Sequence, residues 1–493
     1  MPRLYVYAMG HAHNRLFPPR SRALPAGRAV AGLPCPLFAD PPVAEAQPAS
    51  RAGAMKSPPA PLYTGQRSPD GKDAHLGLPD AVSMPEAVQR ALKFNPSLGS
   101  QESQSRSSEE GRKSARGAFG PKLGMSYTAV KQERKSSPAS SRPPELGTYS
   151  WAVEVSQPVF QGFRLLATYQ KAALQSDSDK ASLRKAELDM TEQVQTYFLD
   201  YLRAEENVRS ERDSLARLRD QLRITKAFYD VGLRPRLDVL QAEVNVSQAE
   251  NQLIQVENNR DTYLAKLNTL LGLPATARAA YTGKLVHVPF RRSLEQCLEA
   301  AYRQRPDLYM AAKSVEIAGK DQRVAQSDYY PQVEAYYNIN QTGNTPDLQR
   351  SGDRSSRGTT WEVGARATWN VFQWGTTYYA DKQAGWLVTK MRYEEEDLKL
   401  QVGYDIKSKL LAVHEAEKRI SVAEKGVEQA TEAYNVALAR YQEQVGTNFD
   451  VLDASSKLTT AQASLTSAKA DYLTALAQIY VAMGEFHPDL MQR

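Results

Sequence analysis

The residues best placed to do chemistry are two aspartates, Asp450 and Asp453. They stand three apart at the start of an expected helix, so their carboxylates lie on one face. In an assembly of copies around an axis, these acids would form two stacked rings able to gate a passage. The alternative is helix capping, because the helix dipole stabilises an acid in the first turn.

An internal copy of this turn helps to separate the two interpretations. DVLDA at 450–454 repeats DVLQA at 238–242, so the first copy keeps the acid as Asp238 but has Gln241 in place of Asp453. Capping can therefore explain the shared acid and not the extra one. This difference favours the carboxylate rings over capping alone, and we therefore expect Asp450 and Asp453 to form a gate.

No set of residues indicates catalysis. The six histidines are scattered, and the chain has no HExxH, GxSxG or phosphate-binding loop. Cys297 falls at an apolar position of a short helix, which predicts a small buried side chain. Residues 1–79 contribute +5 of the net charge of +6, so no basic stripe remains for nucleic acid. We expect no enzyme, cofactor, structural metal or nucleic-acid partner.

A tandem duplication supplies the elements that position these turns. SMPEAVQRALKFNPSL at 83–98 aligns with SLEQCLEAAYRQRPDL at 293–308, an offset of 210 that also relates Trp151 to Trp361. Further along, VFQ at 159–161 recurs at an offset of 212. One structural unit is thus repeated. We expect a first repeat at 81–285, a second repeat at 286–486 and a C-terminal tail at 487–493.

Each repeat is expected to contain two strands of alternating apolar and polar residues. They are predicted at about 121–131, 149–160, 331–342 and 359–372. The alternating runs within them are about nine to eleven residues long, which suits tilted strands that cross a bilayer. Tryptophans at or near the strand ends indicate an interfacial girdle. A soluble hairpin with one face on a core is the alternative.

The last strand shows which residues each face carries. Val363, Ala365 and Ala367 are expected to face lipid, and the alternating residues Glu362, Arg366 and Asn370 are expected to line water. Four strands cannot close a barrel, and open edges in lipid leave backbone groups unpaired. We expect three copies and twelve strands, because the lumen of eight strands is filled by side chains.

Long helices follow the second strand of each repeat. No proline interrupts 161–230, and a helix of about 70 residues spans ~105 Å. The turn at 231–235 leads into a return helix with apolar residues at heptad spacing, which predicts coiled-coil packing. The expected helices are 161–230, 236–271, 373–443 and 449–483. A coiled-coil scaffold alone would explain these helices but not the strands.

The chain resembles the TolC-type outer-membrane factors over about 81–486. The matching motifs are ALKFNPSL at 91–98, QPVFQGF at 157–163, the turns VGLRPRLDVLQA and VGTNFDVLDA, and the duplication. The resemblance implies a mixed α+β, mostly α fold: a periplasmic tunnel of antiparallel coiled-coil helices and four transmembrane strands per chain in a trimeric twelve-stranded barrel. It implies a passive exit duct in the outer membrane for type I protein secretion or efflux. Its partners would be outer-membrane lipid, a periplasmic adaptor and an inner-membrane ABC or other export pump.

The resemblance also bears on the turns. It implies that the aspartate pair closes the periplasmic entrance and binds polyvalent cations, so cations would block at Asp450 and Asp453. The adaptor is expected at the turns farthest from the strands, at Val231, Gly232, Leu233, Val445, Gly446 and Thr447. Gly232 and Gly446 are expected to satisfy the turn conformation. VGTNFD is two residues shorter than the family pattern, and Asn448 stands where an arginine linking hairpins is expected.

The first eighty residues are rich in Pro, Ala, Arg and Ser, and we expect them to be disordered or processed. Their best export signal, AVAGLPCPLFA at 29–39, is broken by two prolines. Cys35 lacks the preceding small residue that lipidation needs. The weak signal favours the rival hypothesis, a trimeric coiled-coil scaffold that does not transport.

Overall fold

The computed structural model describes residues 81–133, 145–343, 345–348 and 358–490. The chain divides into Met1–Lys72 and Asp73–Arg493, and the described residues belong to the second unit. The expected disordered or processed segment at 1–80, with its weak export signal and Cys35, lies outside them.

The described residues are mostly helical and include one antiparallel sheet with strand order β1-β2-β3-β4. In chain order the elements are α1 (Met84–Phe94), α2 (Pro96–Gly117), β1 (Lys122–Glu133), β2 (Glu145–Gln161), α3 (Arg164–Asp230), α4 (Arg236–Leu270), α5 (Leu294–Gln304), α6 (Pro306–Gln326), the 3-10 helix η1 (Ser327–Tyr329), β3 (Gln332–Gly343), β4 (Gly358–Thr368), α7 (Thr376–Gln442) and α8 (Asn448–Ala482). The expectation of a mixed α+β, mostly α fold is confirmed.

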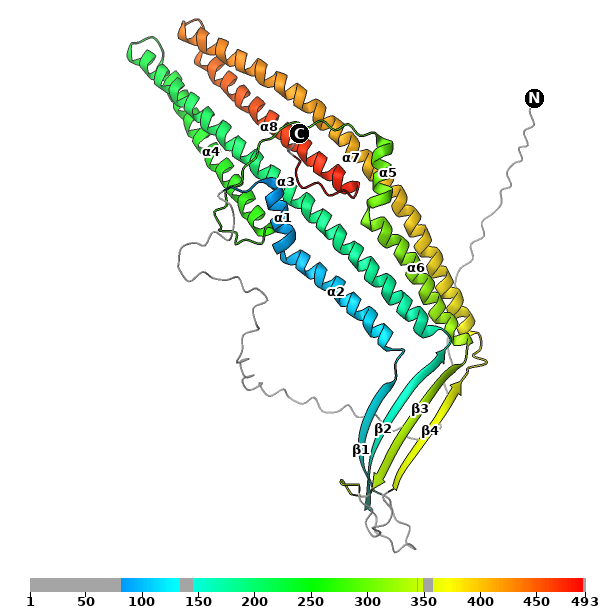
Figure 1. Ribbon diagram of the computed structural model, residues 1–493. Coiled ribbons are helices and arrows are strands. Elements are labelled where there is room, and N and C mark those ends of the chain that lie inside the picture. The colour runs from blue at the N-terminus through cyan, green and yellow to red at the C-terminus, as the bar shows by residue number, and fades with distance from the viewer. Residues whose placement is uncertain (1–80, 134–144, 344, 349–357, 491–493) are drawn as a thin grey trace, which may run out of the picture. The chain divides into compact units, whose positions relative to one another are not determined.

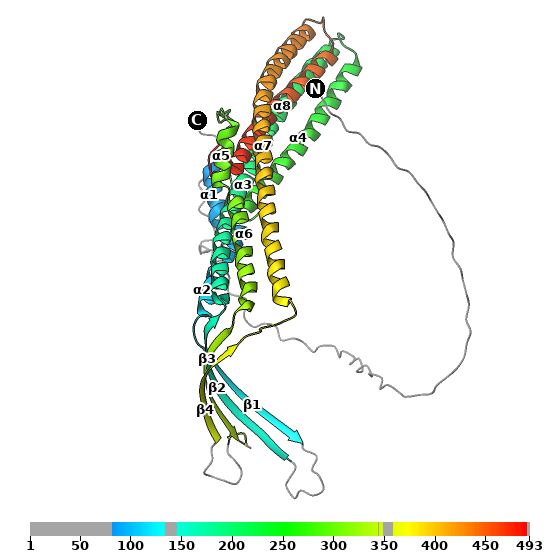
Figure 2. The same ribbon diagram turned by 90° about the vertical axis from the view of Figure 1, so that its right-hand side faces the viewer.

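Helices α2, α3, α6 and α7 run side by side, with α6 packed against both α3 and α7. The sheet lies at one end of these helices, and the α3–α4 and α7–α8 turns lie at the opposite end (Figure 1, Figure 2). The apolar core is centred between them, where Phe198, Ile406 and Tyr472 are fully buried. This arrangement separates the sheet from the turns by the length of the helices.

The first hairpin is held in register by ion pairs at seven-residue steps. They are Arg212–Glu257 (2.6 Å), Arg219–Glu250 (2.7 Å) and Lys226–Glu243 (3.8 Å), all between α3 and α4. The second hairpin has Glu424–Lys469 (3.7 Å) at the position of the first pair, with the charges exchanged. Exposed pairs contribute about 0.2–1 kcal/mol each, so they select the antiparallel register more than they stabilise the fold.

Each long helix starts after two residues in the left-handed conformation. Gly162 and Phe163 have φ of 56° and 66°, and Trp374 and Gly375 have φ of 49° and 81°. Glycine is the first of the two left-handed residues in the first repeat and the second of them in the second repeat. These residues turn the chain from strand to helix, so α3 begins at Arg164 rather than at 161 as predicted.

The fourth strand is shorter than predicted. It ends at Thr368, opposite Gln332, and Asn370 therefore lies beyond the strand. The pairing stops there because β3 is preceded by Pro331, which has no N–H, and by η1. The prediction that Asn370 belongs to the strand is wrong for a single chain.

The sheet also corrects the alignment of the two repeats. Trp151 lies opposite Tyr127, whereas the residue opposite Tyr337 is Val363. Trp151 is therefore equivalent to Val363, and the expected match to Trp361 is displaced by two residues. The extra two residues lie between β3 and β4. An even displacement leaves the same side chains on each face.

Some helical and aromatic positions depart from the predictions. Trp386 lies within α7 and Trp151 within β2, so these two are not at strand ends.

Helices α2 and α6 were not predicted. In α2 only Leu98 and Ser105 are buried, so its sequence carries no apolar period. The prediction that Cys297 is a buried residue of a short helix is confirmed.

Candidate functional site: hairpin tips and strand faces

The two hairpin tips, residues 231–235 and 443–447, lie against each other. The Arg234 guanidinium donates to the Gly446 carbonyl at 2.7 Å and lies over the ring of Tyr441, 5.0 Å from its centroid. The apolar side chains of Val231 and Val445 are exposed to solvent, with accessibilities of 68% and 67%. The tips therefore combine a polar contact between hairpins with exposed apolar side chains.

Asn448 joins four helices just behind the tips. Its side chain is 2% exposed, and its Oδ1 accepts a hydrogen bond from Gln221 Nε2 of α3 at 2.8 Å. Its Nδ2 donates to the Asp238 carbonyl of α4 at 3.3 Å. Beside it, the hydroxyls of Thr225 and Tyr441 are 3.0 Å apart, which adds α7. The residue that stands where an arginine was expected thus links the two hairpins of one chain.

The glycines of the tips play different roles. Gly232 has φ of +78°, as predicted, but in the second tip the left-handed residue is Gln444, with φ of +64°. The prediction that Gly446 adopts the turn conformation in the same way is wrong. A Cβ on Gly446 would lie 3.2 Å from Arg440, so the glycine permits close approach. The spacing to the first aspartate, counted from Gln444 to Asp450, equals that from Gly232 to Asp238.

Asp450 caps its helix. The Thr447 hydroxyl and backbone amide donate to Asp450 Oδ2 at 2.7 and 3.0 Å, and the Asp450 amide donates to the hydroxyl at 3.2 Å. These hydrogen bonds, that of the hydroxyl first, hold the pKa of the Asp450 carboxyl below its ordinary value. Thr447 is therefore the N-cap of α8, a role that the sequence reading missed.

Asp453 has a different partner. Its Oδ2 accepts from Lys457 Nζ at 2.7 Å, one helical turn further along. In the first repeat, α4 begins after Pro235 without a side-chain cap, so Asp238 has no counterpart of the Thr447 contact. Capping accounts for Asp450, whereas Asp453 lies outside the cap.

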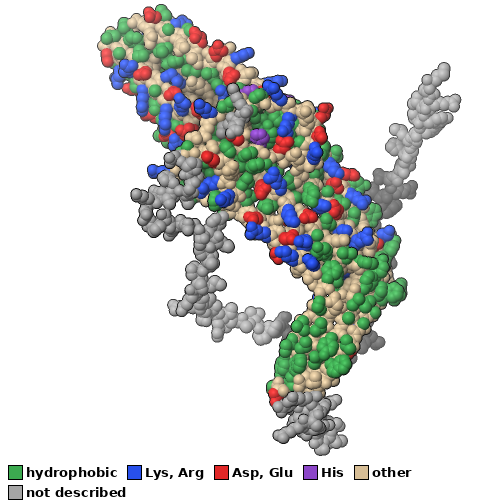
Figure 3. Space-filling view, in the orientation of Figure 1, with side chains coloured by type: hydrophobic (Ala, Val, Ile, Leu, Met, Phe, Trp, Pro, Cys, Tyr) green, Lys and Arg blue, Asp and Glu red, His purple; other side chains and the backbone are tan. Residues whose placement is uncertain are grey.

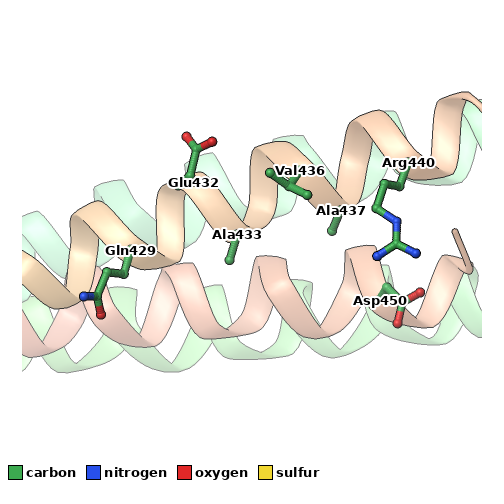
Figure 4. Close-up of a pocket in the computed structure, with 7 residues that line it drawn as sticks. All are labelled: Gln429, Glu432, Ala433, Val436, Ala437, Arg440 and Asp450. Carbon is green, nitrogen blue, oxygen red and sulfur yellow. The ribbon is translucent and has the colours of Figure 1, made fainter.

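A groove runs between α7 and α8 behind the second tip (Figure 4). It has a volume of about 510 Å³. Ala433 and Ala437 point from α7 toward α8, and the Arg440 guanidinium lies beside Asp450 (Figure 4). The lining residues are Gln429, Glu432, Ala433, Val436, Ala437, Arg440 and Asp450. No other element of the described chain fills the groove.

The sheet has one apolar face that continues across its four strands. One row joins Leu123, Val155, Tyr337 and Val363, and the next joins Met125, Val153, Ile339 and Trp361. In a single chain the side chains of the outer strands are exposed, with Met125 77% and Val363 67% accessible, while Val153, Val155 and Ile339 of the inner strands are half-buried. Figure 3 shows hydrophobic side chains gathered over the strands.

The residues that were predicted for the two faces of β4 alternate along the strand. Val363, Ala365 and Ala367 alternate with Glu362 and Arg366. The Tyr336 hydroxyl donates to Glu362 at 2.6 Å, and the Arg366 guanidinium lies 5.1 Å from the centroid of the same ring. Glu362 and Arg366 therefore share the polar face.

The described residues contain no group of three or more His, Cys, Asp or Glu side chains placed to hold a metal ion. In this part of the chain, no helix is long and apolar enough to cross a membrane.

Comparison with known proteins relates this arrangement to export channels. Residues 87–273 and 297–485 match the family model described as outer membrane efflux protein. The outer membrane protein TolC of Vibrio cholerae is 24% identical over 383 residues, which cover 77% of this chain and 85% of that protein. The alkaline protease secretion protein AprF of Pseudomonas aeruginosa is 22% identical over 392 residues, which cover 77% and 79%.

Solved structures agree on the fold. The outer membrane protein VceC of Vibrio cholerae superposes with a TM-score of 0.67 at 18% identity, covering 82% of this chain and 96% of that one. The CmeC outer membrane channel of Campylobacter jejuni gives a TM-score of 0.70 at 17% identity, covering 81% and 85%.

The Asn448 contacts can be tested by substitution. Asn448→Ala removes the 2.8 Å acceptor of the buried Gln221 amide, which keeps only its longer contact with the Thr225 hydroxyl at 3.4 Å, and we expect the free energy of unfolding to fall by roughly 1–3 kcal/mol. Asn435→Ala, at an exposed position of α7, is the control and should change it little. Denaturant unfolding followed by circular dichroism measures both. Equal stability of the two variants would show that Asn448 does not hold the hairpins together.

Proposed function

Because the chain belongs to the outer membrane efflux protein family, we propose that it is the exit duct of a tripartite export system. It is an outer-membrane protein whose helices lie in the periplasm, and its family consists of channels rather than enzymes. In the proposal it acts as a passive conduit. A periplasmic adaptor joins it to an inner-membrane ABC or other export pump.

The observation that carries this proposal is the combination of an apolar sheet face with two unpaired sheet edges. Within the chain, β1 and β4 each pair on one side only. An unpaired backbone group in hydrocarbon costs several kcal/mol, so strands in a bilayer must close into a barrel. Three copies supply twelve strands, whose lumen is wide enough for a passage, whereas eight strands leave none. We therefore infer a homotrimer.

Helix α7 supports assembly of copies. Tyr379, Trp386, Tyr393 and Leu400 recur at seven-residue steps and are 68–75% exposed. Such a stripe on a helix of a single chain favours burial against another subunit. The rival proposal, a coiled-coil scaffold, explains the stripe but gives no role to the apolar face of the sheet.

The proposed cargo rests on the names of the relatives and on the sequence of one turn. Among the relatives, one is named for alkaline protease secretion and another, OpmQ of Pseudomonas aeruginosa, for pyoverdine export. Proteins and small molecules are thus both represented. Our proposal covers type I protein secretion and efflux, and the Asp-Val-Leu-Asp turn favours the secretion and general-export branch.

We assign the lipid-facing side of β4 to Val363, Ala365 and Ala367, and the water-filled side to Glu362 and Arg366. If Ala365 lies near the bilayer midplane, Ala365→Arg should cost about 2–4 kcal/mol and lower the trimer yield on refolding into lipid. Gly364→Arg, on the other face, is not a matched control because Tyr336 crowds it. Thr360→Arg, at an exposed position of the polar face, serves instead and should assemble. A normal trimer yield for Ala365→Arg would reverse the assigned faces.

The gate is assigned to Asp450 and Asp453, where three copies would bring six carboxylates together. Trivalent cations added on the periplasmic side of a planar bilayer should block the conductance, and Asp450→Ala with Asp453→Ala should abolish the block. Asp238→Ala, the equivalent change in the first repeat, should leave it intact. Equal block in the double variant would leave capping as the role of Asp450.

The adaptor is assigned to the tips. Leu233 and Val445 are 52% and 67% exposed and make no cap, whereas Thr447 and Gly446 are needed for the turn itself. Leu233→Ser with Val445→Ser should therefore reduce cross-linking to the adaptor without dissociating trimers. Tyr309→Ser, a change at a similarly exposed position on α6 away from the tips, should have no effect. Unchanged cross-linking and export in the double variant would place the adaptor elsewhere.

A further inference from the structure

Two shorter helices meet end to end between the long helices α3 and α7. Helix α8 packs against both long helices on the side of the tips, and α6 packs against both on the side of the sheet (Figure 1). Helix α8 ends at Ala482 and α6 begins at Pro306, so a break separates them. Arg305 reaches across this break, because its guanidinium donates to the Ala482 carbonyl at 3.3 Å.

Charged side chains gather at the break. Arg305 pairs with Asp307 at 2.7 Å and with Asp405 of α7 at 2.9 Å, and Lys409 lies 3.7 Å from the same aspartate. The side chains of Arg305 and Asp307 are 17% exposed, and those of Asp405 and Lys409 are half-buried. Because water screens these charges only in part, an imbalance among them costs more than it would at the surface.

The equivalent junction of the first repeat has no such charges. Asn95 and Ser97 stand at the positions of Arg305 and Asp307. Asn95 donates to the Leu270 carbonyl at 2.8 Å, so a neutral side chain closes that junction. The fold therefore does not require an ionic cluster at this place.

Two further acids face the cluster from α3. Asp189 and Glu192 are half-buried and three residues apart, which places them on one face of the helix. Among the described residues, neither carboxylate accepts a hydrogen bond or forms an ion pair. Burial raises the pKa of both carboxyls above the ordinary value, and the charge of Lys409 offsets this only in part.

The acids of the cluster outnumber its cations. The charged groups that face Asp189 and Glu192 are Lys185 on α3, Arg305 and Asp307 where α6 begins, and Asp405 and Lys409 on α7. Helix α8 adds only the Ala482 carbonyl, which already accepts from Arg305. Four acids thus share three cations, of which Lys185 is exposed to solvent. A proton taken up at the break would relieve this excess of negative charge.

We propose that the cluster is a proton-sensitive joint between the two repeats. Protonation of Asp189 and Glu192 removes the excess charge at the break and strengthens the contact of α3, in the first repeat, with the start of α6 and with α7, in the second. The joint lies between the sheet and the tips, away from the residues assigned to the gate and to the adaptor. It adds a response to pH that the proposed conduit does not itself require.

Linkage fixes the sign of this response. A carboxyl whose pKa is raised on folding binds its proton more tightly in the folded chain than in the unfolded chain. Above the folded pKa, the charged acids therefore destabilise the folded state. This penalty is relieved as the pH falls through the folded pKa toward about pH 4, where ordinary carboxyls titrate. The joint should accordingly be tighter in mild acid than at neutral pH.

Unfolding by denaturant at about pH 7.5 and about pH 4.5 tests the joint on the assembled protein in detergent. Asp189→Asn with Glu192→Gln keeps the shape of both side chains and removes their charges. The midpoint of this variant should exceed that of the wild type at neutral pH, and the difference should shrink in acid. Glu206→Gln with Asp213→Asn, which changes two exposed acids of the same helix, should alter the midpoint little at either pH.

Two results would overturn the proposal. A lower midpoint for Asp189→Asn with Glu192→Gln at neutral pH would show that the charged acids stabilise the fold. An equal difference from the wild type at both pH values would show that their protonation plays no part. Neither result depends on conductance or export, so the proposed conduit would stand in both cases.

Removal of the facing cation gives a reciprocal test. Lys409→Met leaves Asp189 and Glu192 facing Asp405 without the ammonium group, so the midpoint should fall most at neutral pH and less in acid. Lys407→Met, at an exposed position of α7, is the control and should have little effect at either pH. A loss of the same size at both pH values for Lys409→Met would assign Lys409 a packing role and contradict the joint.

Discussion

The unpaired edges of the four-stranded sheet are the constraint on which the rest of the structure depends. The backbone groups of β1 and β4 lack partners on one side, and the adjoining face is apolar from Leu123 to Val363. Water satisfies such edges, but hydrocarbon cannot. Closure with further copies removes both edges. Because α3 follows β2 after only two residues, Gly162 and Phe163, closing the sheet would also arrange the helices around the same axis.

Equivalent junctions between helices occur in both repeats, but different side chains form their hydrogen bonds. Before α2, Asn95 donates to the Leu270 carbonyl at the end of α4, and before α6, Arg305 donates to the Ala482 carbonyl at the end of α8. The scaffold can therefore stay constant while individual positions diverge. Near the tips, Asn448 stands where the first repeat has Arg236, and its contacts with α3 and α4 join the two hairpins.

The sequence predicted what local patterns determine. Alternation marked the four strands, and the absence of proline marked α3 and α7. It missed α2, since a polar helix covered by α3 on a narrow face has no apolar period. It missed Gln444, because a left-handed residue that is not glycine carries no compositional signal. The Asn448 contacts join residues more than two hundred positions apart, which no local pattern reveals.

The number of copies in the complex tests the central claim most directly. Native mass spectrometry of the complex extracted from outer membranes in detergent counts the chains without assuming a cargo. The account predicts three copies, which give twelve strands and a lumen wide enough for export. A monomer or a dimer as the membrane-extracted species would contradict it, because four strands cannot close and eight leave no passage.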